Sequence, residues 1–284
     1  MAVALLWAVP LCGVPRAEAQ TGIQEIGSRL QLLVDRKLIE KMHDAQLILH
    51  PPVDRGVVFH FDKPWEGPQS AYVTILQDGD QYRMYYRGGG DLGREYTCMA
   101  VSADGIPWER PKLGLFEFEG SKANNIVLAP ATYGEVVSDP GHPAVFRDEN
   151  PECPPEARYK AVIRARKPGG LLVFQSADGL RWSLLHPQPV ITEGAFDSQN
   201  LAFYDAHLGA YRAYWRIFTA GRRAIRTATS QDLIHWEPWQ DLKYVDSPPE
   251  QLYTNVVKPY SRAPHLLIGF PTRYVDRGWS DSMR

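Results

Sequence analysis

The stretch from Gly194 to Trp239 reads GAFDSQNLAFYDAHLGAYRAYWRIFTAGRRAIRTATSQDLIHWEPW. Three runs rich in aromatic or β-branched residues, 201–204, 211–218 and 224–230, are separated by short polar or glycine-containing breaks, and Trp236 opens a fourth run. Hairpin-length breaks between such runs are typical of antiparallel strands joined in order. The stretch therefore predicts a four-stranded antiparallel meander.

Two spacings in this stretch recur earlier in the chain and indicate a repeat. A tyrosine and an arginine five positions apart are followed each time by a serine and a tryptophan six positions apart. A period of roughly 50 to 75 residues with about four strands per repeat is typical of β-propeller blades. We predict an all-β fold of the β-propeller type, with a β-sandwich of similar hairpins as the alternative. The three copies are Tyr82–Arg87 with Ser102–Trp108, Tyr159–Arg164 with Ser176–Trp182, and Tyr211–Arg216 with Ser230–Trp236.

The composition fits a globular protein with many turns and gives no support for a polyanionic partner. The 31 basic and 33 acidic residues leave a net charge of −2. A nucleic-acid-binding protein would carry a basic face, so no nucleic-acid partner is expected. The 23 glycines and 23 prolines agree with a chain that turns often.

The first residues are typical of a secretory signal. Residues 2–11 are mostly apolar, and Ala17-Glu18-Ala19 resembles a cleavage site, although no Lys or Arg precedes the apolar run. We expect a signal peptide over 1–19, an N-terminal segment over 20–60 and a propeller domain over 61–284. The mature protein would be secreted or periplasmic, with no membrane association. Cys98 and Cys153 either form a disulfide or remain free, and their spacing is not that of a metal motif.

The predicted propeller is incomplete at its C-terminal end. A fourth blade begins near 253–257 and continues over 266–270. The residues after Arg273 are too few for two further strands, so about three and a half blades are present. Either the N-terminal strands close the last blade or the sequence is a fragment, and we favour the fragment because an open ring leaves an exposed sheet edge.

Three acidic residues precede expected first strands and are the candidate catalytic groups. The first strand of each blade lines the propeller axis, so residues just before these strands gather at one mouth of the channel. The acids are Glu66, Asp197 and Glu250, and the second blade offers Asp139 and His142 instead. Side chains suited to a sugar lie beside the acids: Trp65 for stacking, and Gln199, Asn200 and Asn255 for hydrogen bonds to hydroxyls.

Carboxylates gathered in one pocket suit glycoside hydrolysis. One must be protonated to assist the leaving group, and its neighbours raise its pKa by burial and like-charge repulsion. Another must be ionised, as nucleophile or as base for water. The alternative is that each acid caps a turn or pairs with an arginine. Arg87 and Arg216 either bind the acids or substrate, or tie the blades together, and Arg164 is interpreted as a tie between blades.

The sequence resembles a known superfamily. Ser230 to Trp236 (SQDLIHW) is similar to the blade motif of the five-bladed propeller glycosidases, which include glycoside hydrolase families 32 and 43. The segments DKPWEG from Asp62, GAFDSQN from Gly194 and GFPTRY from Gly269 extend the resemblance over roughly residues 28–284. The resemblance implies five blades, of which this chain would lack the last one and a half.

The superfamily carries three axial acids: a nucleophile or base, a transition-state stabiliser and a general acid. The resemblance implies Glu66 as nucleophile or base, Asp197 as stabiliser and Glu250 as acid. The N-D-P-N-G, R-D-P and E-C motifs of the superfamily are absent, and the counterpart of R-D-P is Ser138-Asp139-Pro140. We therefore expect an exported glycoside hydrolase-like protein that needs no cofactor and no metal. The alternatives are a non-catalytic glycan-binding propeller and a structural or protein-binding propeller.

Overall fold

The structure is a computed structural model that describes residues 25–89 and 94–278. The chain divides into two units, with the boundary between His50 and Pro51. The first unit has turns but no helix or strand within residues 25–50. The signal peptide predicted over 1–19 lies outside the described residues.

The second unit is built from antiparallel β-strands. Within the described residues it holds one short 3-10 helix, η1 (Pro155–Ala157), and the strands β1 (Thr74–Asp78), β2 (Gln81–Gly88), β3 (Tyr96–Ser102), β4 (Ile126–Leu128), β5 (Thr132–Tyr133), β6 (Val136–Arg147), β7 (Tyr159–Lys167), β8 (Leu171–Ser176), β9 (Ser183–Leu184), β10 (Leu201–Asp205), β11 (Ala210–Thr219), β12 (Arg222–Ser230), β13 (Gln240–Asp241), β14 (Val257–Tyr260) and β15 (Ala263–Gly269).

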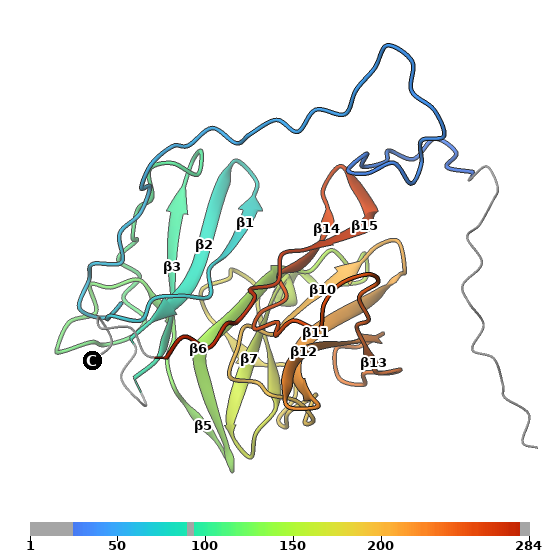
Figure 1. The fold of residues 1–284 in the computed structure, drawn as a ribbon. Coiled ribbons are helices and arrows are strands. Elements are labelled where there is room, and N and C mark those ends of the chain that lie inside the picture. Colours follow the sequence, from blue (N-terminus) through green and yellow to red (C-terminus); the bar gives the residue numbers. More distant parts are fainter. Residues whose placement is uncertain (1–24, 90–93, 279–284) are drawn as a thin grey trace, which may run out of the picture. The chain divides into compact units, whose positions relative to one another are not determined.

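The strands form four sheets that follow one another along the chain, as blades do (Figure 1). Their strand orders are β1-β2-β3-β4, β5-β6-β7-β8-β9, β10-β11-β12-β13 and β14-β15, and every pairing is antiparallel. The prediction of an all-β, propeller-type fold with about three and a half blades in the chain is confirmed. The meander predicted over 194–239 is the third blade.

The first long strands of successive blades lie next to one another. Strand β6 contacts both β1 and β10, and β10 contacts β14. The side chains that immediately precede β1, β10 and β14 therefore come together with those of β6, which is the arrangement of a propeller axis.

Apolar side chains between the blades form the core. One cluster joins the second and third blades and includes Phe146, Val173 and Trp215, and another joins the first and second blades around Tyr85 and Phe174. The alternation within a strand explains this packing, because successive residues point to opposite faces. In β2, Tyr85 faces the second blade, whereas its neighbours Met84 and Tyr86 pack on the outer face of the first blade.

The recurring serine and tryptophan mark one type of turn, as predicted. The Ser230 hydroxyl accepts hydrogen bonds from the backbone N–H groups of Asp232 (3.2 Å) and Leu233 (2.9 Å), and the Asp232 carboxylate accepts one from Ile234 (2.8 Å). Ser102 and Ser176 make the same contacts in their copies. Trp236 packs in the core between the second and third blades.

Some strand boundaries differ from the prediction. The fourth strand of the first blade is β4, within a segment that the sequence suggested was a linker. The last blade starts at Val257 rather than at residue 253 because Val256 has a φ of 46°, which an extended strand excludes. Residues 57–61 form no strand.

The two cysteines of the second unit are free. Cys98 is buried in the first blade, and Cys153 is partly buried after β6. The alternative of two free thiols is therefore the correct one. Within the described ranges no helix has the length and apolar character needed to cross a bilayer.

Candidate functional site

A cluster of ionisable side chains lies where the blades meet. Glu95 immediately precedes β3, Asp139 and His142 belong to β6, and Asp197 lies shortly before β10. The ligand atoms of Glu95, Asp139 and His142 lie within 4.8 Å of one another, and all three residues are buried. His142 Nε2 lies 3.0 Å from the Asp197 carboxylate, whose side chain is 64% exposed. The cluster therefore extends from a buried carboxyl pair to an exposed carboxylate.

A bulge in β6 brings this cluster together. Asp139 pairs with Arg164 of β7, but the next paired residue is Ala144, which faces Val162. Four residues of β6, Pro-Gly-His-Pro, thus oppose a single residue of β7. Prolines cannot donate to a strand ladder, so they are tolerated at such a bulge. The bulge turns His142 toward Asp197.

Gly141 makes room for Glu95. A Cβ atom at Gly141 would lie 2.6 Å from the Glu95 Cβ and 2.8 Å from its Oε2, closer than real contacts allow. The bulge and the absence of a side chain at Gly141 together let a carboxyl from the first blade pack against the first long strand of the second. The close approach of Glu95 to β6 therefore depends on the absence of a side chain at Gly141.

The environment separates the pKa values of the three carboxyl groups. Burial, together with the hydrogen bond to Asp139, raises the pKa of Glu95 to about 7. Burial opposes ionisation of Asp139, but the hydrogen bond from Glu95 and the charge of His142 outweigh it and lower its pKa. The hydrogen bond from His142 lowers the pKa of Asp197 to about 2. Below about pH 7 the cluster holds one protonated acid beside two carboxylates.

Three arginines border the carboxyl groups. Arg87 forms an ion pair with Glu95. Arg164 Nη1 lies 3.3 Å from both the Asp139 and the Asp197 carboxylates, so it joins them. Arg166, two residues further along β7, lies 3.6 Å from both Glu95 and Asp139. Arg164, interpreted from sequence as a tie between blades, belongs to the cluster.

Aromatic side chains from the first and last blades extend the site. The Tyr72 ring lies 4.8 Å from the His142 ring, and its hydroxyl is 3.3 Å from that of Tyr253. The Arg216 guanidinium lies 4.8 Å from the Tyr253 ring centre and donates to a backbone carbonyl at 2.9 Å. Residues of all four blades thus contribute to the site.

Glu95, Asp139 and His142 have donor atoms that a metal ion could use, but their surroundings do not favour a cation. Arg87, Arg164 and Arg166 already neutralise the two carboxyl groups. A divalent cation would meet these fixed positive charges and would displace the proton between Glu95 and Asp139. The arrangement fits a proton-sharing carboxyl pair better than a metal centre.

Glu66 is held away from this cluster. Its side chain is fully buried, and its carboxylate accepts hydrogen bonds from the Tyr86 hydroxyl (2.5 Å), Arg110 Nε (2.7 Å) and the Lys63 backbone N–H (2.9 Å). A carboxylate with these partners fixes the turn before the first blade. The structure therefore does not place Glu66 where a nucleophile or base could reach a substrate.

Glu250 and Trp65 also have separate environments. Glu250 pairs with Arg273 at 3.0 Å, and no contact joins it to Asp197 or Glu66 among the described residues. Trp65 donates to Asn125 at 2.6 Å and packs edge-on against Phe118 on the outer face of the first blade. The prediction that the three acids share one pocket with Trp65 is not met, because two of them are each held by an arginine of their own.

The predicted amide ligands serve mainly as ties between segments. Gln199 donates to the backbone carbonyl of Pro143 at 2.9 Å and to Thr74 Oγ1 at 3.1 Å, so it joins three blades. Asn200 binds backbone groups of its own loop, and Asn255 donates to the Tyr214 carbonyl at 3.3 Å. Their burial leaves these amides little access to a sugar.

Glu95, Arg166, Tyr72 and Tyr253 are the site residues that the sequence did not reveal. The one feature of the sequence that points toward Glu95 is the glycine-rich segment at 88–90, which lies shortly before it. Its partner Asp139 is 44 residues away in another blade, and only a four-residue bulge makes them meet. Of the predicted residues, Asp197, Arg87 and Arg216 lie at or beside the cluster.

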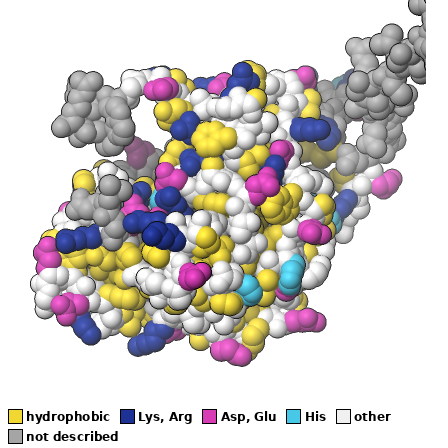
Figure 2. All heavy atoms as spheres, turned by 90° about the horizontal axis from the view of Figure 1, so that it is seen from below, with side chains coloured by type: hydrophobic (Ala, Val, Ile, Leu, Met, Phe, Trp, Pro, Cys, Tyr) yellow, Lys and Arg dark blue, Asp and Glu magenta, His cyan; other side chains and the backbone are white. Residues whose placement is uncertain are grey.

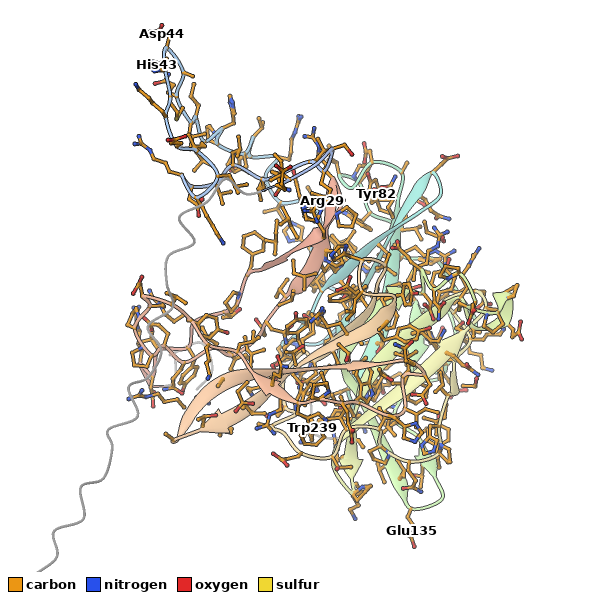
Figure 3. All side chains as sticks on the ribbon, turned by 90° about the vertical axis from the view of Figure 1, so that its right-hand side faces the viewer. Arg29, His43, Asp44, Tyr82, Glu135 and Trp239 are labelled. Carbon is orange, nitrogen blue, oxygen red and sulfur yellow. The ribbon has the colours of Figure 1, made fainter. Side chains whose placement is uncertain are left out.

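A second hollow in the surface offers fewer chemical groups. It has a volume of about 620 Å³ and is lined by Tyr133, Glu135, Leu184 and Gln188, among others. Glu135 lies at the tip of the turn between β5 and β6 (Figure 3). A single carboxylate without a second acid cannot supply the acid and base of glycoside hydrolysis.

One face of the molecule has mixed charge. Acidic and basic side chains are interspersed with apolar ones on the face shown in Figure 2. This agrees with the small net charge of the whole chain.

Comparison with known proteins finds similarity to solved structures alone. No protein-family model matches the sequence, and no curated protein matches it significantly. Among solved structures, a thermostable family-43 glycoside hydrolase matches at a TM-score of 0.44 and 15% identity, over 70% of this chain and 62% of the other.

Two further matches are named as enzymes. An endo-1,4-β-xylanase from Bacteroides thetaiotaomicron matches at a TM-score of 0.42 and 20% identity, over 60% of this chain and 51% of the other. A family-32 β-fructofuranosidase from Bombyx mori matches at 0.42 and 14% identity, over 67% and 40%. Two of the three matches are described as members of families 43 and 32, the families that the sequence resembles. The chain spans about half the length of the structures that it matches.

Proposed function

We propose that the protein is an exported glycoside hydrolase acting on poly- or oligosaccharides, with the carboxyl cluster between the blades as its catalytic site. The observation that carries this proposal is the pair formed by Glu95 and Asp139 beside the exposed Asp197. Glycosidases need one carboxyl that is protonated and one that is ionised at the same pH. The raised pKa of Glu95 and the lowered pKa of Asp197 meet this requirement.

The roles follow from protonation and exposure. Glu95 acts as the general acid that protonates the leaving oxygen. Asp139 keeps the proton on Glu95, because two carboxyl groups in contact do not both ionise readily. Asp197 is the ionised group that acts as nucleophile or as base for water, and His142 and Arg164 orient it. This assignment keeps Asp197 as a catalytic residue and replaces Glu66 and Glu250.

The remaining groups position the sugar. Tyr72 and Tyr253 from the first and last blades form an aromatic edge beside His142. Aromatic faces and a small number of polar groups are what a carbohydrate site requires. The reaction as proposed needs only these side chains and water.

A glycan-binding protein without catalysis is the second candidate. It is favoured by the ion pairs that neutralise the cluster, since Asp139 and Asp197 share Arg164. A carboxylate engaged in this way is less available as a nucleophile. Both functions require that the protein binds a glycan, but only the hydrolase would also cleave it.

Release of reducing sugar from a panel of oligosaccharides tests the proposal. We expect turnover of at least one member by the wild-type protein, and a loss of about 100-fold or more with Asp197→Asn. Glu135→Gln, in the second hollow, is the matched control and should retain activity. Binding without turnover would favour the second candidate, and loss of activity in the control instead of in Asp197→Asn would move the site to the second hollow.

A further inference from the structure

The charges around the proposed catalytic cluster do not balance. Glu95, Asp139 and Asp197 supply three carboxyl groups, and Glu95 keeps its proton up to about pH 7. Arg87 of β2 and Arg164 and Arg166 of β7 form ion pairs with them, and the charge of Arg216 of β11 also helps to lower the pKa of Asp197. Arginine is charged at all relevant pH values. Below about pH 7 the described residues of the site therefore carry more positive than negative charge.

Arg166 is the arginine whose binding capacity is least used. Within the described part of the chain its two carboxylate neighbours both lie at 3.6 Å, beyond hydrogen-bond range. Its side chain is 38% exposed, compared with 11% for Arg87. A guanidinium has five N–H donors in a planar fork that fits a carboxylate or a sulfate. Arg166 thus presents donors to solvent directly beside the acid Glu95.

Arg164 lies two residues before Arg166 on β7 and is also accessible. Its side chain is 30% exposed, and its two contacts with Asp139 and Asp197 are both long, at 3.3 Å. Both guanidinium groups lie beside the same Asp139 carboxylate, at 3.3 Å for Arg164 and 3.6 Å for Arg166. The two guanidinium groups therefore form an adjacent pair at the mouth of the site.

We propose that the substrate is an anionic carbohydrate, and that Arg166 together with Arg164 binds a carboxylate or sulfate ester on the sugar next to the scissile bond. This inference rests on the proposed function, because it places the anionic group relative to the catalytic acid. The negative group would supply the charge that the site lacks. Uronic acids and sulfated sugars share this chemistry.

The kinetic test compares matched pairs of substrates with the wild-type protein. One arm uses oligouronates from pectin and alginate, each with its carboxyl-reduced neutral form. The other arm uses carrageenan oligosaccharides, sulfated and desulfated. We expect kcat/KM to favour the anionic member in one arm by about tenfold to 100-fold, which is typical of a charged hydrogen-bonding group, and to fall with added salt. The arm that shows the preference identifies the anionic group.

Arg166→Gln links the preference to this residue. We expect it to lower kcat/KM for the anionic member by at least about tenfold more than for its neutral counterpart, with Arg166→Lys intermediate. Arg181 is an exposed arginine in the turn after β8, and Arg181→Gln is the control. It should leave kcat/KM unchanged for both the anionic and the neutral member. Equal rates on the charged and neutral members, or an equal loss on both with Arg166→Gln, would overturn the inference.

A calorimetric arm separates this inference from the proposed function. If no substrate is turned over, binding of the same oligosaccharides to the wild-type protein and to Arg166→Gln is measured. Binding of the anionic members that Arg166→Gln weakens would support the inference although hydrolysis had failed. An absence of binding by any anionic member would contradict it.

Discussion

At the residue scale the account depends on a proton shared between Glu95 and Asp139. Neither position is unusual in sequence, and each carboxyl taken alone would ionise near pH 4. Contact between them, burial and the neighbouring arginines separate their behaviour. The sequence could identify Asp197 as a candidate because it precedes a strand, but the partner of Asp139 could not be found, because the contact joins two blades.

The pH dependence of kcat/KM follows from these pKa values. Glu95 must be protonated, so activity should fall as the pH rises through about 7. Asp197 must be ionised, and its pKa of about 2 leaves it ionised throughout the range in which the protein can be assayed. We therefore expect an alkaline limb near pH 7 and no acidic limb from Asp197 above about pH 3.

Two variants should move the alkaline limb in opposite directions. Asp139→Asn removes a negative neighbour and should shift it to lower pH, because Glu95 then loses its proton more readily. Arg87→Gln removes a positive neighbour and should shift it to higher pH. Rate profiles of both variants on the same substrate provide the measurement. Shifts in the same direction would show that Glu95 does not determine the limb.

At the element scale, turn chemistry was predictable and strand irregularity was not. The serine, aspartate and tryptophan of the repeat predict the turn because each residue has a local partner within six positions. The bulge in β6 left no comparable pattern: Pro140 to Pro143 reads as a break in a strand, yet β6 runs through it from Val136 to Arg147. The candidate site lies at the irregular element, as sites often do.

Gly141→Ala tests whether the bulge positions Glu95. The added methyl would lie 2.6 Å from the Glu95 Cβ, so Glu95 must move away from Asp139. We expect a loss of activity of about tenfold or more, together with a destabilisation of about 1–3 kcal/mol from overpacking. Gly269→Ala in β15, where the nearest atom is 3.0 Å away, is the comparison. Wild-type activity in Gly141→Ala would show that Glu95 needs no exact placement against β6.

Asp178→Ala tests the repeated turn. The Asp178 carboxylate accepts hydrogen bonds from the backbone N–H groups of Leu180 (2.8 Å) and Arg181 (2.9 Å). Losing them should lower the free energy of unfolding by about 1–2 kcal/mol without an effect on activity. Chemical denaturation of Asp178→Ala beside Glu149→Ala, an exposed control, measures the difference. A loss of activity at unchanged stability would contradict a purely structural role.

At the scale of the whole molecule, the blades are joined by apolar packing and by a few buried polar ties. The repeat spacing predicted the order of the first three blades correctly, since each of them is a local meander with its own turn signals. Contacts between blades carry no such signal, so Gln199, Asn200 and Asn255 were interpreted as sugar ligands although they bind backbone groups. Buried amides must be satisfied wherever they lie, so residue type alone cannot distinguish the two roles.

Gln199→Ala measures the strength of these ties. Its side-chain nitrogen donates to Pro143, Thr74 and Tyr72, and truncation leaves buried acceptors without a donor. We expect a destabilisation of about 1–3 kcal/mol. Gln188→Ala, at an exposed position, should have almost no effect. Equal unfolding free energies for the two variants would show that Gln199 does not hold the blades together.

The measurement that tests the central claim most directly is how the loss of kcat in Glu95→Gln depends on the leaving group of the substrate. The comparison uses a natural oligosaccharide and a dinitrophenyl glycoside of the same sugar, identified from the panel. The dinitrophenolate leaves without protonation, so loss of a general acid affects only the natural substrate. The account predicts that Glu95→Gln lowers kcat by about 100-fold to 10,000-fold on the oligosaccharide and by less than about tenfold on the dinitrophenyl glycoside. Equal losses on the two substrates, or wild-type rates on both, would contradict the assignment of Glu95 as the acid.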